Sequence, residues 1–210
     1  LRRLRSDYVD LYQCHRPDPE TPLEETIRAM DDLIRQGKVL YWGFSEWPVE
    51  QIEKALQICG DRLYRPKSSQ PQYSLLHRDI ERKVIPLCSR AGIGQVVWSP
   101  LAQGVLTGKY KPNAAPPSDS RAVDNRQNQF IKPWVNDRAL LERVQRLAPL
   151  AAEAGCSMSQ LALAWCLRQS NVTSCIIGAT RPQQVEENAE ASGIKLDQET
   201  IRRIEDAMGE

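Results

Sequence analysis

His15 combines a reactive side chain with a suitable position in this sequence. It follows a short apolar run at residues 9–13, which is typical of a strand, and Arg16 and Pro17 come next. A histidine at the carboxyl end of a strand can donate a hydrogen bond from its imidazole to a substrate carbonyl. A surface histidine without a chemical role remains the alternative for His15, and it is the preferred interpretation for His77.

A second group of residues suits phosphate. Gly178 ends a predicted strand, and Thr180 is predicted to begin the helix that follows. The amino end of a helix presents free N–H groups and positive potential, which favour an anion. Lys109 and Arg121 flank a proline-rich segment and would add cationic contacts to the same phosphate. Solvated surface charge is the alternative for both.

Trp98 stands near the end of a predicted strand, directly before Ser99 and Pro100. Its indole is suited to stacking on a flat ring, although a buried core tryptophan explains the residue equally well. The sequence contains no G-x-G-x-x-G, P-loop, H-E-x-x-H or G-x-S-x-G motif. The known Rossmann and Walker nucleotide sites are therefore unsupported.

Strands and helices must alternate to position these residues. The strand-like segments lie at residues 9–13, 39–44, 70–75, 95–99 and 174–178. Helix patterns lie at about 21–37, 48–59, 79–89, 137–154, 157–168, 180–191 and 197–208. This alternation predicts an α/β fold with parallel strands and right-handed crossovers. Chemistry at strand ends is typical of a parallel (β/α)8 TIM barrel with its site at the carboxyl face.

Local signals predict several helix ends. Thr21 is predicted to be an N-cap with Pro22 as the first helical residue, and Asn136 is predicted to cap the helix at 137–154. Ser157 and Gln160 have the spacing of a capping box.

A complete barrel has eight β/α units and about 250 residues, whereas five units can be counted here. We therefore expect one partial barrel domain over residues 1–210, truncated at its amino end. Residues 109–134 contain four prolines and little periodicity, which predicts a long loop inside this domain. Loops of that length are usually functional or mobile.

Composition limits the class of partner. There are 28 Lys and Arg residues against 27 Asp and Glu, and this balance argues against binding of nucleic acid or a membrane surface through net charge. The longest uncharged stretch, residues 91–108, contains Pro100 and four glycines and is unsuited to spanning a membrane. Six cysteines without C-x-x-C spacing predict reduced thiols in a cytoplasmic protein and no zinc site.

At its strand ends the sequence resembles the aldo-keto reductases, in particular the branch that includes the β subunits of voltage-gated potassium channels. The stretches that carry the resemblance are DYVDLYQCHRPD, GKVLYWGFSEW, QPQYSLLHRDIE, WSPLAQGVLTGKY and SCIIGATRPQQVEENAEA. They occur in the family's order over residues 7–191, so the resemblance covers nearly the whole chain.

The resemblance implies a (β/α)8 barrel that binds NADPH or NADP+ without a Rossmann domain. His15 matches the family's catalytic histidine, Ser45 and Gln70 match residues that hold the nicotinamide carboxamide, and Glu46 lies beside Ser45 at a cofactor-lining position. Trp98 matches the aromatic residue that stacks on the nicotinamide. The positions implied along the pyrophosphate are Ser99, Pro100, Leu101 and Gln103, with Lys109 and Arg121 reaching the phosphates. Those implied around the 2′-phosphate and adenine are Gly178, Thr180, Gln184, Glu187 and Asn188.

The implied reaction is hydride transfer from NADPH to a small aldehyde or ketone. In the family a tyrosine protonates the oxygen, and a lysine paired with an aspartate lowers the pKa of that tyrosine. These three residues belong to the first barrel units, upstream of Leu1, and Tyr8, Tyr12 and Tyr41 do not match the tyrosine's position. His15 is then the single member of the tetrad in this sequence.

Three interpretations remain open. The parent protein is an NADPH-dependent carbonyl reductase, which His15 favours because animal channel β subunits tend to have asparagine there. Alternatively it is a regulatory subunit that binds the cofactor and a potassium-channel α subunit, as a homotetramer like its relatives. The third interpretation is an inactive gene fragment, which we would expect to aggregate or remain molten because an open sheet leaves unpaired edges.

Overall fold

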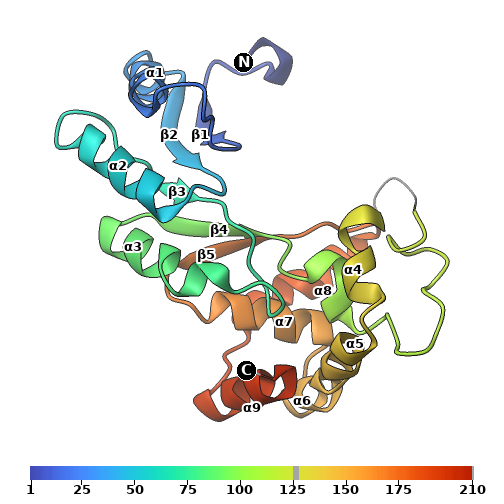
Figure 1. Cartoon of the computed structure of the whole chain (residues 1–210). Coiled ribbons are helices and arrows are strands. Elements are labelled where there is room, and N and C mark those ends of the chain that lie inside the picture. Colours follow the sequence, from blue (N-terminus) through green and yellow to red (C-terminus); the bar gives the residue numbers. More distant parts are fainter. Residues whose placement is uncertain (125–127, 210) are drawn as a thin grey trace. The chain divides into compact units, whose positions relative to one another are not determined.

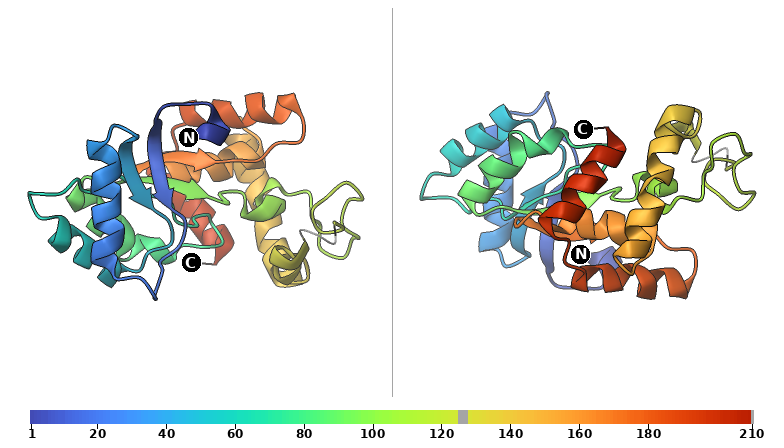
Figure 2. Two further views of the ribbon diagram at one scale, coloured as in Figure 1. Left: turned by 90° about the horizontal axis from the view of Figure 1, so that it is seen from above. Right: turned by 90° about the horizontal axis from the view of Figure 1, so that it is seen from below.

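Strands and helices alternate along the chain in the order that the sequence predicts (Figures 1 and 2). The computed structural model describes residues 1–124 and 128–209. By their internal contacts these residues form two compact units. Unit 1 consists of Leu1–Gln72 and Asp79–Val97, and unit 2 consists of Tyr73–Arg78 and Trp98–Glu210.

Unit 1 is built on parallel strands whose order in the sheet is their order in the chain. Its elements are η1 (Arg2–Leu4), β1 (Val9–Cys14), α1 (Leu23–Arg35), β2 (Val39–Phe44), α2 (Val49–Cys59), β3 (Ser68–Ser69), η2 (Asp79–Glu81), α3 (Val84–Ala91) and β4 (Gly94–Trp98). Trp98, the last residue of β4, is assigned to unit 2. In the register of β1 and β2, Gln13 lies opposite Gly43. Parallel pairing of sequential strands sets their carboxyl ends at the same edge of the sheet.

The core of unit 1 lies between the sheet and its helices. Trp42 and Phe44 of β2 are fully buried in one cluster with Ile27 of α1 and Ile52 of α2. Burial of each such side chain stabilises the fold by roughly 1.5–3 kcal/mol. The Trp47 ring stacks on Phe44, with 4.9 Å between the ring centroids. These contacts fix the chain on both sides of Ser45 and Glu46.

Unit 2 is mainly helical. Its elements are η3 (Ala102–Thr107), η4 (Asn128–Phe130), α4 (Lys132–Val135), α5 (Arg138–Gln145), α6 (Leu147–Glu153), α7 (Met158–Leu167), β5 (Val172–Ile176), α8 (Pro182–Glu190), η5 (Ala191–Gly193) and α9 (Gln198–Met208). Seven residues of α7, from Gln160 to Cys166, are buried. A helix that is apolar on all sides belongs at the centre of its unit, and α7 contacts η3, α6, β5 and α8.

Two predicted helices are shorter than the sequence suggested, for the same reason. A proline in a helix clashes with the carbonyl four residues earlier. Pro86 therefore prevents α3 from extending back through Arg82, and the predicted helix at 79–89 divides into η2 and α3. Pro149 acts in the same way on Gln145, so the predicted helix at 137–154 divides into α5 and α6.

Three predicted helix starts were wrong. Thr21 does not cap α1, because its hydroxyl donates to Asp18 at 2.7 Å and the N-cap is Pro22. Asp137 caps α5 in place of Asn136, by accepting from the amide of the third residue of the helix. Thr180 lies before α8, which begins at Pro182.

Two strands lie earlier in the chain than predicted. The predicted strand at 70–75 is replaced by β3 at Ser68–Ser69, since Pro71 has no N–H for a ladder. The strand predicted at 174–178 is β5, which begins at the buried Val172, so Gly178 follows the strand. The predicted loop at 109–134 contains η4 and the start of α4, and its residues 125–127 lie outside the described part of the chain.

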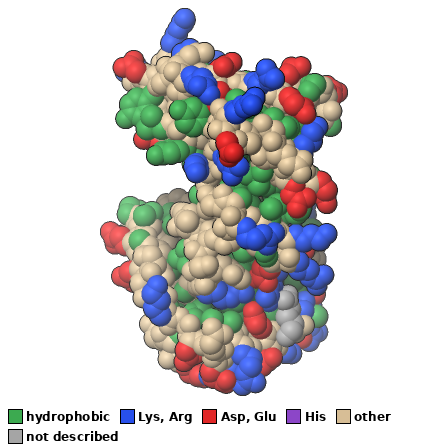
Figure 3. All heavy atoms as spheres, turned by 90° about the vertical axis from the view of Figure 1, so that its left-hand side faces the viewer, with side chains coloured by type: hydrophobic (Ala, Val, Ile, Leu, Met, Phe, Trp, Pro, Cys, Tyr) green, Lys and Arg blue, Asp and Glu red, His purple; other side chains and the backbone are tan. Residues whose placement is uncertain are grey.

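Surface charges agree with the balanced composition. The face in Figure 3 carries basic and acidic side chains intermixed, and hydrophobic side chains gather at the end that holds α1 and β1. Within the described residues, no helix combines the length and the apolar character needed to cross a membrane.

Candidate functional site

Four predicted site residues of unit 1 follow the ends of its strands. His15 comes directly after β1, Ser45 and Glu46 directly after β2, and Gln70 directly after β3. His15 is exposed, Glu46 and Gln70 are half-buried, and Ser45 is buried. The parallel sheet therefore presents these residues at one edge. Gln70 reaches this edge because β3 ends at Ser69, whereas the sequence predicted a strand at 70–75.

Backbone hydrogen bonds extend the sheet beyond the strands and fix these residues. The Ser45 amide donates to the Cys14 carbonyl at 2.9 Å, and the Gln70 amide donates to the Phe44 carbonyl at 2.8 Å. The Ser45 hydroxyl donates to the Gln70 carbonyl at 2.7 Å and accepts from Nη1 of Arg16 at 3.1 Å. The structure thus brings Ser45 and Gln70 into direct contact and adds Arg16, which the sequence gave no role.

Glu46 has an unusual backbone that its own side chain stabilises. Its φ is 57°, in the left-handed region that costs a residue with a side chain about 1–3 kcal/mol. Oε1 of Glu46 accepts from the Gln72 amide at 2.6 Å. This bond connects the segment after β2 to the segment after β3, so these two segments cannot move independently of one another.

In unit 2 the segment directly after β4, at residues 99–104, has the same kind of backbone. Ser99, Ala102 and Gln103 all have φ between 47° and 57°, and Gly104 has φ 95°. Strain of this kind persists where surrounding contacts hold it, and it clusters at functional sites. One such contact is Nε2 of Gln103 donating to the Ser99 hydroxyl at 2.9 Å. The predicted residues Trp98, Pro100 and Leu101 lie in or next to this loop, with Pro100 buried and the other two half-buried.

Two cations of unit 2 lie against glycine backbone. Nη1 of Arg121 donates to Oε1 of Gln103, and Nη2 of Arg121 lies 3.3 Å from the place that a Gly178 Cβ would take. Lys109 has the same relation to Gly104, whose Cβ would lie 3.5 Å from Nζ. Both Lys109 and Arg121 are exposed. Bare backbone beside exposed cations forms a cradle suited to an anion.

The remaining predicted residues lie in α8 or in the segment directly before it. The Thr180 amide and hydroxyl both donate to Oε1 of Gln184, at 2.8 and 3.2 Å. Glu187 and Asn188 lie further along α8, and the Glu187 carbonyl accepts from Nε2 of Gln160 on α7 at 2.9 Å. Hydrogen bonds thus connect Thr180 to Gln184, whereas the backbone of Glu187 is bonded to Gln160 of α7.

Burial makes Cys14, beside His15, a poor nucleophile at neutral pH. Burial raises the pKa of the Cys14 thiol to about 11. A thiol attacks as its thiolate, and this pKa leaves very little thiolate at pH 7. All six cysteines are free thiols in the structure described.

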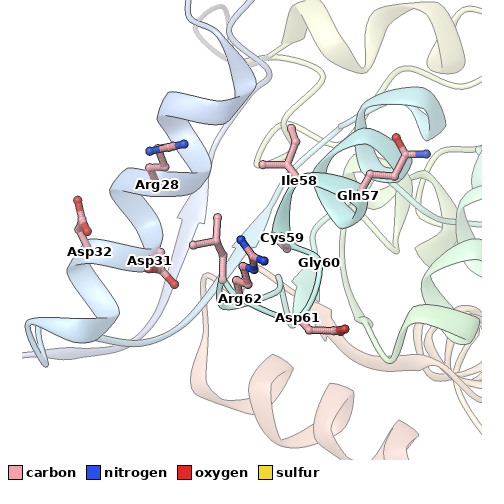
Figure 4. A pocket seen from close by; sticks show the side chains of 10 residues that line it. Arg28, Asp31, Asp32, Gln57, Ile58, Cys59, Gly60, Asp61 and Arg62 are labelled. Carbon is pink, nitrogen blue, oxygen red and sulfur yellow. The ribbon is translucent and has the colours of Figure 1, made fainter.

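A hollow of about 610 Å³ in unit 1 lies away from these strand ends (Figure 4). Its walls are the middle of α1, with Arg28, Asp31 and Asp32, and the end of α2 with residues 60–63 after it. Asp31 is already bound, because Arg35 Nε and the Tyr64 amide both donate to it. None of the predicted site residues lines this hollow.

Three residues of the candidate site were not predicted from the sequence: Arg16, Ala102 and Gly104. Arg16 follows His15 at a strand end, and that position was a usable signal. Gly104 also gave a signal by its type, because glycine adopts positive φ without strain, whereas Ala102 gave none.

Comparison with known proteins identifies one family for this chain. The model of the Aldo/keto reductase family matches residues 1–208. A probable voltage-gated potassium channel subunit beta from Arabidopsis thaliana is 48% identical over 91% of this chain and 58% of its own length. A protein of the same description from Oryza sativa subsp. japonica is 44% identical over 98% of this chain and 63% of its own length. The chain therefore spans about three-fifths of the length of these relatives.

A solved structure of the same family is also similar to this chain. A thermostable aldo-keto reductase, crystallised with the inhibitor epalrestat, is similar to this chain with a TM-score of 0.75 and 28% sequence identity. The match covers 98% of this chain and 62% of that one. The α/β arrangement described above is thus that of part of a TIM barrel.

Proposed function

The chain belongs to the aldo/keto reductase family. We propose that it functions as an NADPH-dependent oxidoreductase, which reduces an aldehyde or ketone to an alcohol. The observation that carries the cofactor proposal is the cation cradle of unit 2. Arg121 and Lys109 each face the backbone of a glycine, beside a loop in a strained left-handed conformation. A pyrophosphate and a 2′-phosphate are anions of the kind that such a cradle accepts.

The residues present fit NADPH better than a neutral ligand. Side chains at Gly104 and Gly178 would fill the space beside Lys109 and Arg121, and glycine keeps that space open. Arg121 would hold the 2′-phosphate together with Gln184, and Lys109 would hold the pyrophosphate beside Ser99 and Gln103. Guanidinium groups bind phosphate through two parallel hydrogen bonds, which favours arginine for the 2′-phosphate.

In unit 1 the proposed roles concern orientation. The Ser45 hydroxyl already uses its proton on the Gln70 carbonyl, so it would accept from the carboxamide N–H2 of the cofactor. When bound, the cofactor supplies the hydride that reduces the carbonyl carbon. The exposed His15 would donate a hydrogen bond to the carbonyl oxygen of the substrate and so favour its developing negative charge. Trp98 would stack on the nicotinamide ring.

The test is a comparison of NADPH and NADH binding. Arg121→Ala removes one charge-assisted contact, which is worth about 1.5–3 kcal/mol, and we expect NADPH to bind about 10-fold more weakly because Arg121 is exposed. NADH lacks the 2′-phosphate, so its dissociation constant should change little. Titration with either nucleotide, followed by tryptophan fluorescence, measures both constants.

Arg138→Ala is the matched control. Arg138 is also an exposed arginine of unit 2, and its partner is Glu142 on the same helix. We expect this variant to bind both nucleotides like the wild type. An unchanged preference for NADPH in Arg121→Ala would reject the role of Arg121, and a wild-type chain that binds neither nucleotide would reject the cofactor proposal.

A second function is favoured by the names of the relatives. Two proteins that are 48% and 44% identical to this chain are described as probable potassium channel β subunits. A regulatory subunit would bind the same cofactor, assemble as a homotetramer and associate with a channel α subunit. Co-purification with a channel α subunit, together with weak turnover of carbonyl compounds, would favour this function over the reductase.

We also propose a cytoplasmic location. Its support is the set of six free cysteines without disulfide spacing, as expected in a reducing compartment. Fractionation of cells that express the tagged protein tests this proposal.

A further inference from the structure

Tyr73 is a fully buried residue of unit 2 that is held at three separate atoms. Its amide donates to the Trp98 carbonyl at 3.2 Å. Its carbonyl accepts a weak hydrogen bond from the Cys166 thiol at 3.9 Å. Its hydroxyl accepts from Nη1 of Arg168 at 2.8 Å. The backbone of Trp98 is therefore connected to α7 and its C-cap through this one tyrosine.

Arg168 is fixed in turn by its surroundings. Nη1 also donates to the Trp165 carbonyl at 2.9 Å, and the guanidinium lies 3.6 Å from the centroid of the Trp165 ring. Nη2 lies 3.5 Å from Oε1 of Glu205 on α9. A planar guanidinium that is stacked and bonded on several sides has little freedom to turn, so it holds its acceptor in place.

The Trp165 ring is the centre of this arrangement. Arg78 lies 5.0 Å from its centroid and also binds Oε1 of Glu205, at 3.1 Å. The Tyr73 ring packs on Trp165 with 5.3 Å between centroids. Trp165, Arg168 and Glu205 thus hold the segment Tyr73–Arg78 at its first and its last residue.

We infer that Tyr73, fixed by Arg168, is a positioning residue for Trp98. This inference rests on the proposed function, in which Trp98 stacks on the nicotinamide. Tyr73 acts through the Trp98 carbonyl: its amide fixes the peptide of Trp98 and so limits the directions in which the indole can point. A ring that is pre-oriented for stacking binds its partner with a smaller loss of conformational freedom.

The sharpest perturbation is Tyr73→Phe, which removes the hydroxyl that accepts from Arg168 and keeps the buried ring. Tyr110→Phe is a matched control, because Tyr110 is also buried in unit 2 and its hydroxyl has no hydrogen-bond partner in the described structure. The same atom is removed in both variants. Only in Tyr73→Phe does the loss release a bonded group.

The first measurement is ¹⁹F NMR of the full chain labelled with 5-fluorotryptophan, with the Trp98 signal assigned from a Trp98→Phe variant. We expect Tyr73→Phe to shift or broaden the Trp98 signal and to leave the signals of Trp42 and Trp47 unchanged. Tyr110→Phe should leave all of them unchanged. If Tyr73→Phe does not fold by circular dichroism, Arg168→Gln removes the same bond from the other side and should change the Trp98 signal in the same way.

The second measurement is the dissociation constant for NADPH. Loss of one net hydrogen bond corresponds to about 3- to 10-fold weaker binding in Tyr73→Phe, with less than about 2-fold change in Tyr110→Phe. An unchanged Trp98 signal in a folded Tyr73→Phe variant overturns the inference. So does a changed signal with unchanged NADPH binding. If the wild type does not bind NADPH at all, the proposed function fails first and the cofactor role of Tyr73 fails with it.

Discussion

Gly43 is the position at which the smallest substitution should have the largest effect on unit 1. It lies in β2, opposite Gln13 of β1 and Ser68 of β3. In Gly43→Ala the new Cβ would lie 2.9 Å from the Ser68 Cβ and closer still to the Ser68 carbonyl oxygen and to Oε1 of Gln13. Its φ is not in the left-handed region, so the objection to alanine is steric alone.

The cost follows from what must move. Ordinary van der Waals contact begins near 3.4 Å, so relief of the contact with the Ser68 Cβ alone needs about 0.5 Å of separation between β2 and β3, and the closer Ser68 carbonyl oxygen needs more. Overpacking of this kind costs about 1–3 kcal/mol. Separation also weakens the bonds from the Lys67 amide to Trp42 and from the Gln70 amide to Phe44, both 2.8 Å, at about 1 kcal/mol each. We expect a total of about 3–5 kcal/mol, a large part of the usual free energy of unfolding of 5–15 kcal/mol.

Urea denaturation followed by circular dichroism and by tryptophan fluorescence measures this loss. Gly193→Ala is the control, because a Cβ there meets nothing within 4 Å and its φ is also not left-handed. It should be neutral or stabilising by up to about 1 kcal/mol. In Gly43→Ala, an added Gln13→Ala should recover only part of the loss, since the Ser68 carbonyl remains. A Gly43→Ala midpoint equal to that of the wild type would refute the steric argument.

Three smaller effects follow from other contacts. Ser157→Ala removes the hydroxyl that accepts from the Gln160 amide at 3.2 Å, and it should lower the free energy of unfolding by about 1 kcal/mol in urea titrations. The Arg35 guanidinium lowers the pKa of the Asp31 carboxyl below its unfolded value, so its stabilisation is present above about pH 4 and is lost as the pH falls through the folded pKa. Asp31→Asn should therefore destabilise the chain at pH 7 and much less at pH 2, by urea midpoints. Iodoacetamide at pH 8 should alkylate Cys14 about 100-fold more slowly in the folded chain than in urea, by mass spectrometry, since burial raises the pKa of Cys14 to about 11.

Features that depend on one helical turn could be predicted from the sequence. The capping box of Ser157 and Gln160 is present with both of its hydrogen bonds, because its partners are three residues apart. The same kind of signal was wrong at Thr21, whose hydroxyl binds Asp18 instead. A local pattern states which bonds are available, and the path of the preceding chain decides which of them forms.

The α/β class and the family were also predictable, since they depend on the order of elements and on long matching stretches. The bonds inside the candidate site were not. Gln103 and Arg121 are 18 residues apart, and Gln103 has a left-handed backbone that its residue type did not signal. Arg168 and Tyr73 are 95 residues apart. Hydrophobic periodicity and motif spacing describe neighbouring residues, so they do not predict contacts between residues that are far apart in the sequence.

The site residues of unit 1 and those of unit 2 are held by different kinds of hydrogen bond. Substitutions in the two units should therefore affect stability and nucleotide binding differently. In unit 1, Ser45 and Gln70 are fixed by backbone bonds that continue the sheet, so a change that weakens the sheet, such as Gly43→Ala, also displaces them. In unit 2, Gln103 and the exposed Arg121 are fixed by side-chain bonds, so Arg121→Ala can alter nucleotide binding without a comparable loss of stability. Binding and stability should therefore change together for substitutions in the sheet of unit 1 and separately for substitutions in the loop of unit 2.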